Sequence, residues 1–131
     1  MHKRNRYFII ASLAYGLIGI GIILTWLINP TLFIGNIPKL HGHIMLLGFI
    51  SMMIFGIALH IIPRFSGRPL FSERLANMQL YIANIGLIIL SIGWILLNTQ
   101  WQILGGSLYW INILLFASNI ILTVRHYGPK G

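Results

Sequence analysis

Acidic side chains and cysteine are almost missing from this sequence. Its 131 residues include no cysteine and a single Asp or Glu, Glu73. Without cysteine, disulfides, iron–sulfur clusters and thiolate metal sites are excluded. The lone carboxylate excludes hydrolysis by paired carboxylates. It also argues against a cation/proton exchanger or a conventional proton relay, because both need a carboxylate buried in the membrane.

Charge of either sign is scarce, and apolar residues are abundant. Only 8% of the residues are charged and 57% are hydrophobic, whereas soluble domains average about 25% charged residues. This composition predicts an integral membrane protein with one domain over residues 1–131. The net charge of +8 does not indicate nucleic-acid binding, because the cations flank apolar runs and form no soluble basic patch.

Four apolar runs have the length of a bilayer-spanning helix. They predict an all-α protein with transmembrane helices at about 7–28, 40–62, 76–97 and 102–124. Asn29-Pro30 follows the first helix, and Pro38 and Pro63 are expected to begin and end the second. The first run, about 22 residues long, exceeds a signal-peptide core and has no small-residue cleavage site, so a retained helix is expected.

Lysine and arginine predict how the helices are oriented. If the N-terminus is inside, Lys39 is the only outer cation of the nine. The cytoplasmic side then holds Lys3, Arg4, Arg6, Arg64, Arg68, Arg74, Arg125 and Lys130. By the positive-inside rule both termini are cytoplasmic, in a multi-pass protein of the cell's inner (cytoplasmic) membrane. The "HGH" at 41–43 is then near the outer face.

Small and amide side chains interrupt the apolar spans. Glycines such as Gly16 and Gly86 permit close helix approach, or leave room for a flat cofactor. Asn84, Asn112 and Asn119 lie within the spans, and interhelical hydrogen bonds are their expected role.

Histidine supplies most of the remaining polar chemistry. Of five histidines, His2 and His126 lie in the flanks and are expected to be solvated. His41 and His43 open the second span, and they point about 200° apart if each residue turns the helix by about 100°. Each could therefore bind a different metal centre on either side of the helix. From spacing alone, an interface role without metal remains open.

His60 lies far along the same span. Its 19-residue separation from His41 corresponds to about 28 Å at about 1.5 Å per residue, so the two cannot share one haem. His60 stays unassigned, either snorkelling to the interface or serving a second cofactor. The other three spans lack histidine, and other soft ligands are few, with Met78 at the start of the third span and Met45, Met52 and Met53 on the second span itself. A six-coordinate haem is therefore expected to take its second axial ligand from another subunit.

The stretch "HGHIMLLGFISMMIFGIALHIIPRF" resembles helix II of haem-copper oxidase subunit I. It also resembles the second helix of the related nitric-oxide-response haem and copper membrane proteins. In subunit I, twelve helices form three four-helix arcs, so the resemblance implies that this chain corresponds to one arc. It further implies that His41 matches the low-spin haem ligand of helix II, and His43 the low-spin ligand of helix X.

The resemblance implies a shared haem b. His41 of one protomer and His43 of the next would hold it in a trimer, and a dimer with the haem at its twofold axis is the alternative. Lys39 would pair with the propionates or serve as an ordinary interface lysine. The family's copper ligands and its histidine–tyrosine pair have no equivalent in this sequence. No copper and no oxygen reduction are therefore expected, and whether the protein is an enzyme stays open.

Bis-histidine haem b predicts electron transfer in a respiratory chain, with a quinol or a cytochrome as redox partner. Two alternatives remain. One is a haem protein that binds nitric oxide or oxygen at an open axial site, and the other is a cofactor-free accessory subunit of a respiratory complex.

Overall fold

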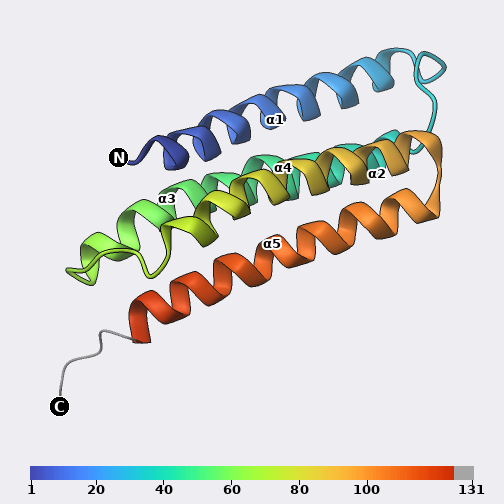
Figure 1. Cartoon of the computed structure of the whole chain (residues 1–131). Coiled ribbons are helices and arrows are strands. Elements are labelled where there is room, and N and C mark those ends of the chain that lie inside the picture. Colours follow the sequence, from blue (N-terminus) through green and yellow to red (C-terminus); the bar gives the residue numbers. More distant parts are fainter. Residues whose placement is uncertain (126–131) are drawn as a thin grey trace.

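The computed structural model describes residues 1–125, which form helices joined by short loops (Figure 1). In chain order the elements are α1 (Lys3–Ile28), α2 (Ile37–His43), the π-helix η1 (Ile44–Ile50), α3 (Ser51–Phe65), α4 (Glu73–Leu96) and α5 (Thr99–Arg125). The elements α2, η1 and α3 run on as one span, Ile37–Phe65. Within residues 1–125, four helices are long and apolar enough to cross a membrane, which confirms the predicted number of spans.

The helices begin a few residues before the predicted spans. α1 starts at Lys3 instead of residue 7, and α4 at Glu73 instead of residue 76. Hydropathy identifies the part of a helix that can lie in lipid, whereas main-chain hydrogen bonding continues through the polar residues beyond it. Side-chain caps set the true starts, since His2 and Ser72 each accept a hydrogen bond from a main-chain N–H of the first turn.

Pro63 does not end the second span, contrary to the sequence prediction. α3 continues through Pro63 to Phe65. A proline this close to the end of a helix removes only one hydrogen bond of the last turn. The Ser66 hydroxyl then donates to the carbonyl oxygens of Ile62 and Pro63, at 2.9 and 3.1 Å, and covers the helix end.

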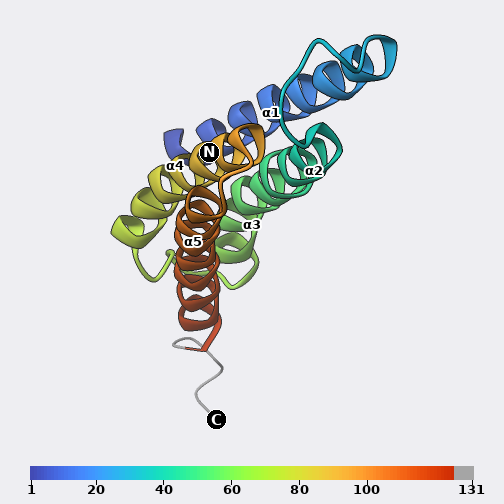
Figure 2. The ribbon, with the colours of Figure 1, turned by 90° about the vertical axis from the view of Figure 1, so that its right-hand side faces the viewer.

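The helices pack as two pairs side by side. α1 packs on the second span, and α4 forms an antiparallel hairpin with α5. α1 and α5 lie at opposite edges of the bundle, with the other helices between them (Figure 2). Phe8, Met52, Phe55, Leu87 and Tyr109 are among the buried core residues, while many large apolar side chains are exposed on the outer faces.

Glycines set the close approach of α4 and α5. A Cβ added at Gly86 would lie 2.9 Å from the main-chain nitrogen of Tyr109, and one at Gly105 would overlap the main chain of Leu90. Here the small residues permit helix contact, which is the first of the two roles expected for Gly86.

The two ends of the bundle differ in chemistry. The N-terminus and the end of α5 lie at one end, and α2, with its histidines, lies at the other (Figure 1). This end of the bundle, with the first half of the second span, is the candidate site.

Candidate functional site at the start of the second span

A π-helix directly follows the His41–His43 motif. In η1 the main-chain hydrogen bonds connect residues five apart instead of four. The Ser51 hydroxyl also donates to the carbonyl of Leu46, five residues back, at 2.8 Å. The Tyr109 hydroxyl of α5 donates to the Leu47 carbonyl at 2.6 Å. Because π-segments are uncommon and concentrate at functional sites, η1 marks this part of the span for attention.

His41 faces α1. Its Nδ1 lies 2.8 Å from the carbonyl oxygen of Gly19. A carbonyl oxygen only accepts, so Nδ1 carries the proton, and in the neutral ring Nε2 keeps a lone pair. A Cβ at Gly19 would lie 2.7 Å from the Sδ atom of Met45 and 3.2 Å from Cγ2 of Ile44, so the glycine leaves room for these side chains of the second span.

His43 faces α4 instead. Its Nδ1 lies 2.7 Å from the carbonyl oxygen of Lys39, one turn earlier in the chain. Its ring packs against the indole of Trp94, with centroids 5.2 Å apart and planes tilted by 35°. The Lys39 ammonium lies 5.0 Å from the centroid of the same indole, in a cation–π contact. Trp94 therefore contacts both His43 and Lys39.

The two imidazoles share one arrangement on different sides of the helix. Each Nδ1 donates to a main-chain carbonyl, and within residues 1–125 neither Nε2 has a hydrogen-bond partner. Metal-bound histidines are typically held this way, because a hydrogen bond from one ring nitrogen fixes the tautomer and aims the other nitrogen at the metal. Both rings are half-buried, so the chain orients them without enclosing them.

One chain does not assemble a larger ligand set around either histidine. Among the described residues, His, Asp and Glu side chains nowhere gather in groups of three able to hold a metal ion. His41 contacts α1 and His43 contacts α4, so the two imidazoles do not converge on one point within the protomer. A centre with two histidine ligands would therefore need one of them from another chain.

An apolar groove lies next to His41, between α1 and η1. It has a volume of about 680 Å³ and is called the α1–η1 groove. Its lining consists of Leu13, Gly16, Leu17, Ile20, Gly21, Leu24, Met45 and Phe49. His41 does not line the groove, but it precedes Met45 by about one turn of the same helix. With no polar side chain in its lining, the groove suits a flat apolar group or a lipid chain.

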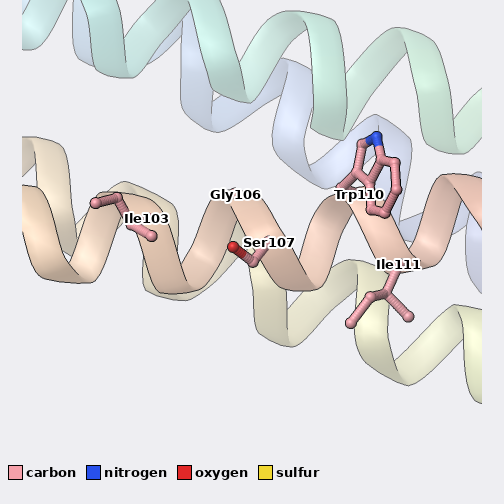
Figure 3. Close-up of a pocket in the computed structure, with 5 residues that line it drawn as sticks. All are labelled: Ile103, Gly106, Ser107, Trp110 and Ile111. Atoms are coloured by element: carbon pink, nitrogen blue, oxygen red, sulfur yellow. The ribbon is translucent and has the colours of Figure 1, made fainter.

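A second hollow of about 520 Å³ lies on the outer side of α5. All of its lining residues come from that helix, and Gly106 and Ser107 leave the gap between Ile103 and the Trp110 indole (Figure 3). No lining residue can bind a metal through a carboxylate, imidazole or thiolate. The hollow therefore offers no metal ligands of these kinds.

The remaining histidines lie apart from this site. His60 is half-buried on α3, and no hydrogen bond to it is formed within residues 1–125, so it stays unassigned. His2 is exposed, as expected for a solvated residue, but it also caps α1. His126 and Lys130 lie outside the described residues.

The partners of the two candidate ligands were not apparent from their spacing. Gly19 acts through its main-chain carbonyl, and Trp94 comes from a distant helix. The only sequence signal was a small residue at Gly19 and an aromatic one near the expected end of the third span. Comparison with known proteins finds no matching family model, no similar curated sequence and no similar solved structure.

Proposed function

We propose that this chain is a membrane haem b protein that transfers electrons, with His41 and His43 as axial ligands shared between subunits. The observation that carries the proposal is the matched orientation of the two imidazoles. Each donates from Nδ1 to a main-chain carbonyl, leaves Nε2 without a partner among the described residues, and faces a different side of the helix.

The surroundings of the histidines fit a haem. Imidazole is a common axial ligand of haem iron, and the α1–η1 groove offers an apolar surface next to His41. Lys39, whose ammonium rests on Trp94, is the cation nearest to His43 along the chain and suits a propionate. When bound, a haem with two histidine ligands supplies one-electron transfer and leaves no open position for a gas.

Shared ligation predicts a closed assembly. His41 and His43 use different faces of one helix, which supports a heterologous contact between subunits, and we propose that this contact closes into a trimeric ring. A dimer is the alternative. The excess of Lys and Arg at the end that holds the N-terminus supports an orientation with cytoplasmic termini, in the inner membrane. A quinol or a cytochrome would then be the redox partner.

Absorption spectroscopy after expression with sufficient haem tests the proposal. The purified, reduced protein should show a sharp alpha band, and His41→Ala or His43→Ala should remove most of the bound haem. His60→Ala is the matched control, because it removes a histidine from the same span and should leave the haem content unchanged. A colourless wild-type protein would refute haem binding.

Haem stoichiometry and carbon monoxide separate the alternatives. One haem per chain fits the ring with shared ligands, whereas one haem per two chains fits a dimer with the haem at its twofold axis. A shift of the reduced spectrum on adding carbon monoxide would indicate an open axial site and a gas-binding protein. If the wild type is colourless, and His41→Ala and His43→Ala assemble as the wild type does, the protein is a cofactor-free subunit.

A further inference from the structure

Two adjoining hollows form one groove between α1 and α4, at the end of the bundle opposite His41. Their volumes are about 210 and 420 Å³, and they share Tyr7, Leu80 and Tyr81 as lining residues. The first hollow opens at His2 and Lys3, and the second reaches Ala11 and Ile85. This combined space is called the α1–α4 groove, and it is separate from the proposed haem site.

Two polar links define the ends of the α1–α4 groove. At its mouth, the Arg4 guanidinium binds the carboxylate of Glu73 and lies 3.2 Å from the amide oxygen of Asn77. At its inner end, the Tyr15 hydroxyl donates to the amide oxygen of Asn84 at 2.9 Å. The two helices are therefore held together at both ends of the groove.

The mouth carries positive charge and hydrogen-bond donors. Lys3 and His2 are exposed there, and so are Tyr7 and Tyr81. The His2 Nδ1 accepts the main-chain N–H of Arg4, so in the neutral ring Nε2 is the donor. That Nε2 lies 3.9 Å from Glu73, but the charge of this carboxylate is offset by Arg4. The mouth thus complements a phosphate group.

The length of the groove matches one leaflet. Residues 3 to 11 of α1, and 77 to 85 of α4, each extend about 12 Å at about 1.5 Å per residue. Half of a hydrocarbon core of about 30 Å is about 15 Å. Below the mouth, Ala11, Leu80 and Ile85 present apolar surface. An acyl chain of that leaflet can therefore lie along the groove while its headgroup stays at the mouth.

We propose that the α1–α4 groove binds an anionic phospholipid from the leaflet on the side of the N-terminus. Its phosphate contacts Lys3 and His2, and one acyl chain lies between α1 and α4. The cationic mouth favours this occupant over a neutral isoprenoid quinone, which has a similar tail but no charge for Lys3 to bind. The site stands independently of haem binding.

Native mass spectrometry tests the site. Protein released from micelles that contain equal amounts of phosphatidylglycerol and phosphatidylcholine should retain phosphatidylglycerol preferentially. Lys3→Gln should weaken that retention about fivefold, the effect of one cation near an anionic headgroup. Arg125→Gln is the matched control, since it removes one exposed positive charge at the same end of the bundle but outside the groove.

A second variant acts on the acyl chain instead of the headgroup. Ile85→Trp places a large ring in the groove at an exposed position, and it should release the bound lipid while circular dichroism shows an unchanged helix content. Equal retention of both lipids by the wild type would overturn the proposal. An equal loss of phosphatidylglycerol retention in Lys3→Gln and Arg125→Gln would also overturn it. Displacement of the lipid by ubiquinone to the same extent in the wild type and in Lys3→Gln would do the same.

Discussion

The Arg4 guanidinium binds the carboxylate of Glu73, the only acidic side chain in the sequence. The Arg4 side chain is 4% exposed and that of Glu73 is 55% exposed. Asn5 and Asn77 also accept hydrogen bonds from the guanidinium, at 3.1 and 3.2 Å. This cluster joins the first turns of α1 and α4, and it satisfies a charge that would otherwise be costly to bury.

Removing Glu73 should destabilise the bundle. Glu73→Ala leaves the buried Arg4 guanidinium without its anionic partner, so we expect the free energy of unfolding to fall by about 1–3 kcal/mol. Denaturant unfolding in detergent micelles measures the change. Arg74→Ala, at the exposed neighbouring position of α4, is the control and should have little effect. Equal stability of the two variants would show that the ion pair contributes nothing.

Two neighbouring glycines of α5 should respond oppositely to the same substitution. A Cβ at Gly105 would overlap the main chain of Leu90, whereas one at Gly106 would meet no atom within 4 Å. Gly105→Ala should therefore force α4 and α5 apart and cost about 1–3 kcal/mol. Gly106→Ala should be neutral, or stabilising by up to about 1 kcal/mol, because alanine favours helix. Thermal unfolding of both variants tests this, and a large loss in Gly106→Ala would contradict it.

The Tyr109 hydroxyl should matter for the π-helix. Tyr109 is buried and donates to the Leu47 carbonyl within η1. Tyr109→Phe leaves that carbonyl without its donor, at an expected cost of about 1 kcal/mol. Tyr81→Phe removes an exposed hydroxyl and serves as the control. Hydrogen exchange of the η1 amides, compared between the two variants, shows whether the loss is local to the π-segment.

Hydropathy predicted the number of spans because lipid requires a long apolar run in each helix. The same signal could not give the helix ends, since Lys3 and Glu73 continue helical hydrogen bonding outside the apolar run. The different directions of His41 and His43 followed from helix geometry, because α2 is a regular α-helix up to His43. These features depend on local rules that a single sequence carries.

The rest of the site depends on contacts between distant segments. No side-chain pattern predicts the π-helix η1. Because η1 lies between His41 and His60, the angle between these two side chains around the helix axis does not follow from a rotation of about 100° per residue. Of the three asparagines, Asn84 forms the expected interhelical hydrogen bond, with Tyr15, whereas Asn119 bonds to the main chain of Ser72, the residue that caps α4. Asn112 forms no such bond, because neither of its amide atoms has a hydrogen-bond partner within the described residues.

Gln79 of α4 is the second buried amide whose polar atoms have no partner within the described residues. Asn119 pairs with Ser72, and a Cβ at Gly105 would lie 2.8 Å from the carbonyl oxygen of Gly86. In this antiparallel hairpin, Gln79 lies seven residues beyond Ser72, and Asn112 seven residues before Asn119, so the two amides lie at about the same level of the hairpin. Both side chains are 0% exposed, and within the described residues none of their polar atoms has a hydrogen-bond partner.

Replacing both amides with apolar side chains should therefore stabilise the protein. Gln79→Leu combined with Asn112→Leu removes four unpartnered polar atoms, so we expect the free energy of unfolding to rise by about 1–3 kcal/mol. Asn119→Leu is the matched control, and it should lower stability because it breaks the hydrogen bonds of 3.0 and 2.9 Å to Ser72. A double variant as unstable as Asn119→Leu would show that Gln79 and Asn112 bind each other, or a buried water, in the membrane.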